Sequence, residues 1–120
     1  MKKRILVVNN DIDTMSLLKG WLERKKYEVK FTGNGEEVPE LVKKFSPDVI
    51  IIDILQHKAA EQLKAGEKTK NIPIIMLTGY TLQDQQKLLT AADDIIEKPF
   101  DPVFLEEKIE KCLKKAGINS

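Results

Sequence analysis

The sequence is poor in the residues that build disulfide frameworks, metal clusters and membrane spans. Its 120 residues include one cysteine, Cys112, so no internal disulfide can form, which fits a reducing compartment. The single histidine, His57, has no cysteine near it in the sequence with which to share a metal ion. No apolar run approaches the length that crosses a bilayer, and the apolar run after Met-Lys-Lys-Arg is too short for a signal peptide. We therefore expect a cytoplasmic protein without a membrane partner.

A surplus of charge of either sign is also missing. The 20 basic and 19 acidic side chains give a net charge of +1, and lysines and glutamates are interspersed without a basic stripe. This balance argues against a direct nucleic-acid partner. The length and the 42% hydrophobic content fit a single domain, residues 1–120, that is large enough to bury a core.

Short apolar runs alternate with segments of helical periodicity. The run 47–55 is apolar on both faces, which is typical of a central strand in a buried parallel sheet. Further strands are expected over 4–8, 27–32, 72–78 and 94–97, the run 27–32 being the least hydrophobic and therefore an edge. Helices are expected from Asp11 or Asp13 to about 26, and over about 36–45, 59–65, 82–91 and 102–117. The apolar face of the last helix is expected to comprise Phe104, Leu105, Ile109, Cys112 and Leu113.

This alternation predicts an α/β fold. Five strand–helix units, (βα)5, imply a doubly wound parallel five-stranded sheet with right-handed crossovers and helices on both faces. A strand order of 2-1-3-4-5 would place Asp53 beside the switch point between the first and third strands, where such sheets keep their sites.

Polar residues follow four of the predicted strands. They are Asn9-Asn10-Asp11, Asp53, Thr78 and Lys98. A carboxylate nucleophile with a hydroxyl and an ammonium that bind oxygens suits phosphoryl transfer. Taken singly, Thr78 is well explained as a cap at a strand end and Lys98 as a surface lysine. Their joint position at successive strand ends favours the functional interpretation.

The motifs together resemble the receiver domain of two-component response regulators, which has a flavodoxin-like fold. The matching segments are the Ile-Leu-Val-Val strand with its polar end, Pro47-Asp48 with Ile51-Ile52-Asp53, Leu77-Thr78, Ala92-Asp93-Asp94 and Lys98-Pro99-Phe100. The resemblance implies that Asp53 accepts a phosphoryl group from a histidine kinase and that Thr78 and Lys98 contact that group. It also implies that an acidic pair at the positions of Asn9 and Asn10 holds Mg²⁺ together with the acceptor.

The resemblance also implies the partners and the limits of the activity. A histidine kinase or phosphotransfer protein would act upstream, and a protein target or an effector domain downstream. The domain would not be an enzyme, beyond self-phosphorylation and autodephosphorylation at Asp53.

The chain departs from the family at the metal site, because asparagine occupies both acidic-pair positions. Neutral amides are poor substitutes for the carboxylates that hold Mg²⁺. Asp11 and Asp53 against Lys98 leave one net negative charge, where two more aspartates would give three. We therefore expect at most a weak Mg²⁺ site built from Asp53, Asn10 and Asp11.

Further departures surround the acceptor. His57 stands where the family usually has proline, and we expect it in a loop. The segments from Asp53 to Thr78 and from Thr78 to Lys98 are shorter than usual, which predicts stunted helices. Ile95 occupies the usual place of an aromatic residue that reports phosphorylation, and Tyr80 is a candidate substitute.

Three classes of function compete. A working phospho-acceptor and a degenerate receiver that signals by binding alone both fit the fold. An enzyme of the same topology fits less well: a phosphatase would want an acid at Leu55, and a flavin carrier a hydroxyl-rich loop at 9–12. We expect a receiver with impaired Mg²⁺-dependent phosphorylation at Asp53, with a purely protein-binding, degenerate receiver as the alternative.

Overall fold

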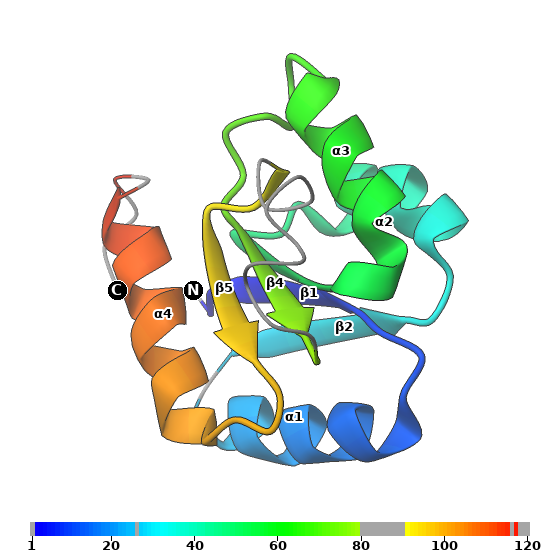
Figure 1. Cartoon of the computed structure of the whole chain (residues 1–120). Helices are drawn as coiled ribbons and strands as arrows, with labels where there is room; N and C mark the ends of the chain where they lie inside the picture. The colour runs from blue at the N-terminus through cyan, green and yellow to red at the C-terminus, as the bar shows by residue number, and fades with distance from the viewer. Residues whose placement is uncertain (1, 26, 80–90, 116, 118–120) are drawn as a thin grey trace.

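The core of the molecule is a parallel five-stranded sheet. The computed structural model describes residues 2–25, 27–79, 91–115 and 117. The strands are β1 (Arg4–Val8), β2 (Glu28–Thr32), β3 (Val49–Asp53), β4 (Ile74–Thr78) and β5 (Asp94–Glu97). Their order is β2-β1-β3-β4-β5 and every neighbouring pair is parallel, so β2 and β5 form the two edges (Figure 1). The expected fold class and strand order are confirmed.

Four α-helices lie in the described part of the chain. They are α1 (Ile12–Arg24), α2 (Val38–Phe45), α3 (His57–Ala65) and α4 (Pro102–Lys115), and 3₁₀ turns η1 (Gly35–Glu37) and η2 (Ile54–Gln56) precede α2 and α3. Asp11 caps α1 as expected, and Gly117, at φ +77°, follows the end of α4. The helix expected over 82–91 and the side chain of Tyr80 lie outside the described residues.

Three boundary predictions are wrong. The strand expected over 47–55 covers only Val49–Asp53, because Asp53 caps the 3₁₀ turn η2, which contains Ile54 and Leu55. The strand expected from Ile72 begins at Ile74, because Pro73 has no N–H to donate to a strand ladder. His57 is the first residue of α3 rather than a loop residue, because η2 leads directly into that helix. Its imidazole lies 3.7 Å from Glu61, one helical turn further along.

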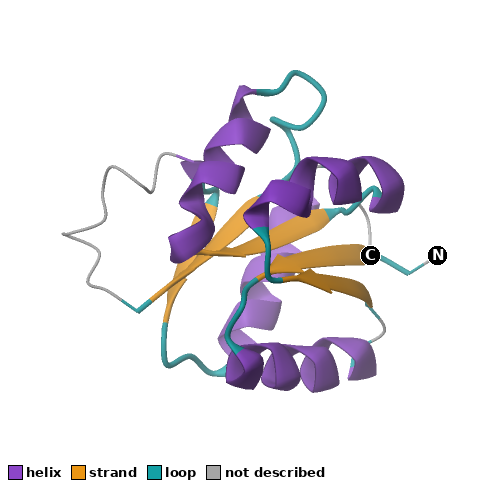
Figure 2. Ribbon diagram, turned by 90° about the vertical axis from the view of Figure 1, so that its right-hand side faces the viewer, coloured by secondary structure: helices purple, strands orange, loops and turns teal. Residues whose placement is uncertain are grey.

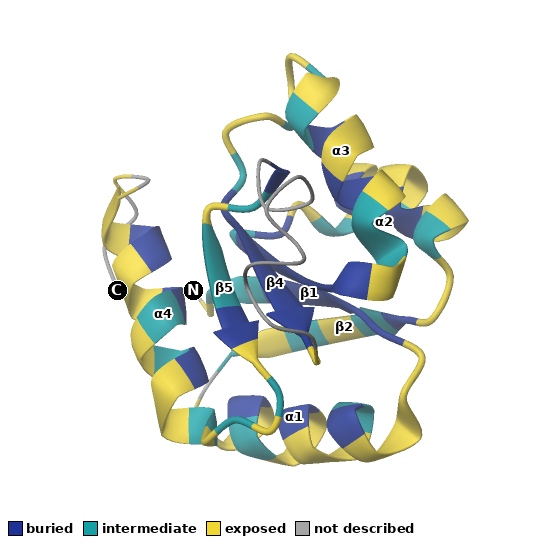
Figure 3. Ribbon diagram, viewed as in Figure 1, coloured by how far each residue is buried: buried dark blue, intermediate teal, exposed yellow. Residues whose placement is uncertain are grey.

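Helices cover both faces of the sheet and create two apolar layers (Figure 2). Successive strand residues point to opposite faces. Ile51 and Ile75 therefore pack against α1 and α4, whereas Ile50 and Ile52 pack against α2 and α3. All five residues of β3 are buried, which explains why this strand is apolar throughout (Figure 3).

Phe104 is a correction to the expected core. Its side chain is 59% exposed, whereas Leu105, Ile109 and Leu113 face the sheet at intervals of four residues. One helical residue is a rotation of about 100°, which places Phe104 outside that stripe. No helix in the described part of the chain is long and apolar enough to span a bilayer.

Lys64 fastens α3 to the beginning of β5. Its ammonium donates to the carbonyl oxygens of Lys70 at 3.1 Å and Ile72 at 3.2 Å, and to Oδ2 of Asp93 at 2.6 Å. The same carboxylate oxygen accepts the backbone N–H of Ile74 at 2.8 Å. All three donors of the ammonium are therefore satisfied by the segments that lead into β4 and β5.

Replacing Lys64 by methionine should lower the free energy of unfolding by about 1–3 kcal/mol, because two carbonyls and a carboxylate lose their donor. Urea denaturation monitored by circular dichroism measures this. Lys68→Met, which removes an exposed lysine of the segment that leads into β4, should change the free energy by less than about 0.5 kcal/mol. Equal effects of the two substitutions would show that the Lys64 contacts do not stabilise the fold.

Candidate functional site

Asp53 is a nearly buried carboxylate at the carboxyl end of the central strand. The residue is 5% exposed, and its Oδ1 accepts the backbone N–H of Leu55 at 2.9 Å, which caps η2. Oδ2 accepts a charge-assisted bond from Nζ of Lys98 at 2.5 Å and a weaker one from Nδ2 of Asn9 at 3.3 Å. Both oxygens of Asp53 are therefore occupied by donors from within the chain.

Parallel strands deliver the partners to this position. Thr78 ends β4 and is fully buried, and its carbonyl oxygen accepts the backbone N–H of Lys98 at 2.7 Å. Lys98 directly follows β5, where the pairing of Thr78 with Glu97 places it at the same edge. The structure thus brings Asp53, Thr78 and Lys98 to one edge, although they are separated by up to 45 residues.

The two asparagines after β1 differ in environment. Asn9 is fully buried; its Nδ2 donates to Asp53 and its Oδ1 accepts the backbone N–H of Asp11 at 2.5 Å. Asn10 is exposed and makes no hydrogen bond within the described part of the chain. Asn9 therefore contacts the carboxylate of Asp53 directly, whereas Asn10 faces solvent.

Asp11 serves as the N-cap of α1. Its Oδ1 accepts the backbone N–H of Asp13 at 3.2 Å, and its Oδ2 accepts the hydroxyl of Thr14 at 2.6 Å. The pKa of Asp11 lies below its ordinary value, chiefly because of the Thr14 hydroxyl; the Asp13 amide and the charge of Lys98 act in the same direction against a desolvation that raises it. Both oxygens of this carboxylate are engaged in capping.

These residues fit Mg²⁺ poorly. A hard cation needs open oxygen ligands, preferably carboxylates. Asn9 directs an NH₂ group at Asp53, and the carboxylates of Asp53 and Asp11 are hydrogen-bonded within the chain. Residues 2–25, 27–79, 91–115 and 117 contain no group of three or more histidine, cysteine, aspartate or glutamate side chains that could hold a metal ion.

Replacing Thr14 by valine should return the pKa of Asp11 toward its ordinary value. In the native protein this lowered pKa favours folding above about pH 4, the ordinary range of the carboxyl, and the contribution disappears as the pH falls through the folded-state value. Carboxyl ¹³C NMR titration of Asp11 measures the shift, with Ser16→Ala as the control. An unchanged pKa in Thr14→Val would show that the hydroxyl is not its cause.

Comparison with known proteins identifies the fold's relatives. The model of the response regulator receiver domain family matches residues 5–110, almost the whole length of the chain. The chain belongs to the response regulator receiver domain family. The polar strand ends of this receiver domain, with Asp53 at their centre, are where the family resemblance led us to expect them.

Named relatives extend the picture. The phosphate regulon transcriptional regulatory protein PhoB of Pseudomonas aeruginosa is 32% identical over 122 residues, which cover 96% of this chain and 53% of that protein. The receiver domain thus spans about half the length of the curated relatives it matches. Because relatives are transcriptional regulators, the expectation that excluded nucleic acid is not supported by these comparisons.

Solved structures agree on the architecture. The signal receiver domain of a histidine kinase from Syntrophus aciditrophicus has a TM-score of 0.88 and 28% identity, covering 98% of this chain and 95% of that one. The receiver domain of a sensor histidine kinase from Pseudomonas aeruginosa is 22% identical with a TM-score of 0.87, covering 95% and 99%, and shows the shared fold. In that protein a magnesium ion is coordinated in the active site cleft.

Sequence reasoning missed the contact between Asn9 and Asp53. It placed Asn9 at the same edge of the sheet as Asp53 but interpreted it as a lost metal ligand. A usable signal was present, because the expected order places β1 beside β3, and the register pairs Val8 with Ile52. The residues that follow this pair are Asn9 and Asp53, so neighbouring side chains were predictable from topology.

Proposed function

We propose that this receiver domain carries its phospho-acceptor position at Asp53 and that its Mg²⁺-dependent phosphorylation is impaired. The observation that carries the proposal is the occupancy of the acceptor carboxylate by Lys98, Asn9 and the backbone of Leu55. The first two bonds converge on Oδ2. An incoming phosphoryl group must displace at least one of these donors, or react with a carboxylate oxygen that still accepts a hydrogen bond from the chain.

The chemistry available to the residues is acyl-phosphate formation. An oxygen of Asp53 attacks phosphorus, the new O–P bond forms as the bond to the donor breaks, and the donor keeps the electron pair. When the ammonium of Lys98 releases the Asp53 carboxylate, it can bind the oxygens of the transferred group. Thr78 lies at the end of β4, the strand next to that of Asp53. Lys98 supplies one positive charge, which leaves part of the negative charge of a phosphoryl group uncompensated.

The proposal is tested by incubating the protein with acetyl phosphate and Mg²⁺ and following its intact mass. We expect addition of one phosphoryl group to be slow and incomplete, because two donors hold Oδ2 and the metal ligands are neutral. Asp53→Asn should abolish any addition. Rapid and complete modification of the native chain, absent in that control, would contradict the proposal that phosphorylation is impaired.

A degenerate receiver that signals only by binding is the second candidate, and one observation favours it. Exposed large apolar side chains occur in α1, η2 and α4, which follow β1, β3 and β5. They are Ile12, Leu17, Leu55, Val103 and Phe104. Beside them, a hollow of about 390 Å³ lies between the first turns of α1 and the loop after β5, next to Lys98. Apolar patches of this kind are typical of protein-interaction sites.

We propose a histidine kinase or phosphotransfer protein as the partner at the edge of the sheet that carries Asp53, and a protein target or an effector domain as the recipient of the signal in the cytoplasm. Titration calorimetry with the downstream protein target distinguishes the two candidates. A degenerate receiver should bind its target equally well as native protein and as Asp53→Asn. A phosphorylation-dependent receiver should bind the target more tightly after acetyl phosphate treatment of the native protein only.

A further inference from the structure

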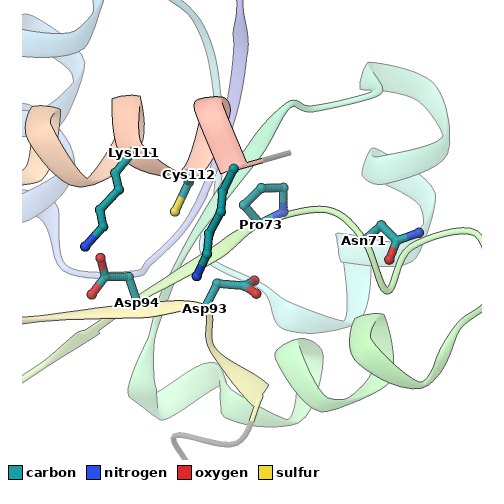
Figure 4. Close-up of a pocket in the computed structure, with 7 residues that line it drawn as sticks. Asn71, Pro73, Asp93, Asp94, Lys111 and Cys112 are labelled. Carbon is teal, nitrogen blue, oxygen red and sulfur yellow. The ribbon is translucent and has the colours of Figure 1, made fainter. Parts of the chain in front are cut away.

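A cavity of about 240 Å³ opens at the end of the sheet opposite Asp53 (Figure 4). Its walls come from the last turns of α4 and from the residues that lead into β4 and β5. Pro73 and Cys112 contribute buried, weakly polar surface. Burial, followed by the charges of Asp94 and Asp93, raises the pKa of the Cys112 thiol, so this part of the wall is uncharged at neutral pH.

The two carboxylates in the cavity already have cationic partners from outside it. Asp93 pairs with Lys64 at 2.6 Å, and Asp94 pairs with Lys108 at 2.9 Å. Partial burial alone would raise the pKa of Asp94, but the hydrogen bond from Lys108, a backbone amide and nearby lysine charges outweigh it, and the pKa lies below its ordinary value. Each of the two carboxylates is therefore paired with an ammonium group from outside the cavity.

Two further lysines on the cavity wall have no such partner. Lys111 and Lys115 are exposed, and neither has a carboxylate oxygen within 4 Å among the described residues. In Figure 4 the amine of Lys111 points toward the carboxylate of Asp94, and the charge of Lys111 contributes to the lowered pKa of that carboxyl. With Asp93 and Asp94 neutralised by Lys64 and Lys108, these two ammonium groups leave the cavity a surplus of two positive charges.

The topology adds to this surplus. The helices that follow the strands return to the amino edge of the sheet, and their last turns carry basic residues. These are Arg24 in α1, Lys43 and Lys44 in α2, Lys64 in α3, and Lys114 and Lys115 in α4. Acidic residues occupy the first turns of α1 and α2 at the other edge. The basic ends of the helices therefore add positive charge at the amino edge, where Glu28, Asp48, Asp93 and Asp94 supply negative charge.

We propose that this cavity binds a small organic dianion with an apolar body, such as an aryl phosphate or an aryl dicarboxylate. The two charges of the ligand pair with Lys111 and Lys115, and its body covers Pro73 and Cys112. The amide of Asn71, at the cavity rim, supplies a further hydrogen-bonding group. The site is separate from Asp53, because its strand residues lie at the opposite ends of β4 and β5 from Thr78 and Lys98.

Titration with phenyl phosphate, followed by ¹H–¹⁵N NMR on the whole chain, tests the proposal. Amide shifts should concentrate at residues 71–74, 93–95 and 111–115. Lys111→Gln/Lys115→Gln should weaken binding about tenfold, or about 1.4 kcal/mol, because the ligand loses two partly solvated ion pairs. Lys43→Gln/Lys44→Gln removes the same charge from the same edge and should change affinity less than about twofold.

Two comparison ligands define the chemistry. Inorganic phosphate, which has the charge without the apolar body, should bind more weakly than phenyl phosphate, and phenylmalonate tests whether a dicarboxylate substitutes for the phosphate. Equal losses of affinity in the two double variants would mean that the ligand is attracted diffusely to the basic edge, and would overturn the proposed binding site. Shifts confined to residues around Asp53 and Lys98, or no shifts at all, would overturn it as well.

Discussion

Mg²⁺ should bind the Asn9→Asp/Asn10→Asp variant at least about a hundredfold more tightly than the native chain. Each restored carboxylate contributes about 1–4 kcal/mol at close range in partly solvated surroundings, and 1.4 kcal/mol corresponds to a factor of ten. The same change removes the hydrogen bond that Asn9 donates to Asp53 at 3.3 Å and sets two carboxylates against each other. Without Mg²⁺ the variant should therefore be less stable than the native protein.

Titration calorimetry measures the affinity, and thermal unfolding with and without Mg²⁺ measures the stability. Gln62→Glu/Asn71→Asp is the matched control, because it adds the same charge at residues that do not contact Asp53. This control should leave the affinity for Mg²⁺ within about threefold of the native value. If the reversion binds Mg²⁺ no better than the control does, the electrostatic account of the asparagine pair is wrong.

Lys98→Met should lower the free energy of unfolding by about 2–4 kcal/mol. The Asp53 side chain is 8% exposed, and removing its cation leaves a nearly buried charge with only an amide and a backbone N–H as donors. Breaking one side of a buried ion pair has effects of this size because the remaining charge is uncompensated. Denaturant unfolding at neutral pH measures the loss.

Asp53→Asn/Lys98→Met should regain more than half of that loss, since the double variant buries no unpaired charge. Lys108→Met provides the comparison, because it breaks the pair with Asp94, whose side chain is 25% exposed and keeps more of its hydration. That substitution should reduce the stability by about 1 kcal/mol. A double variant as unstable as Lys98→Met would contradict the charge argument.

The fold was predictable from the sequence to the extent that apolar periodicity determined it. Val49–Asp53 and Ile74–Thr78 are buried throughout, and such runs indicate central parallel strands whatever surrounds them. Element ends were less predictable, because they depend on local hydrogen bonds. η2 begins where Asp53 accepts the N–H of Leu55, and α3 follows η2 directly, so His57 is helical.

The positions of the candidate site residues were predictable, but their hydrogen bonds were not. The topology placed Asp53, Thr78 and Lys98 at one edge, as the strand order required. Sequence alone did not show that Asp11 would use both oxygens as a helix cap, since that depends on the hydroxyl of Thr14 one helical turn away.

The polar character of the two outermost strands limits how this molecule can associate. Glu28 and Lys30 are exposed on β2, and Glu97 is exposed on β5, where Asp94 is held by Lys108. Adding a sixth strand at either edge would remove water from these charges, which disfavours edge-to-edge association of sheets. We therefore expect encounters between copies to leave the sheet at five strands, so that assembly has to proceed through helices or loops.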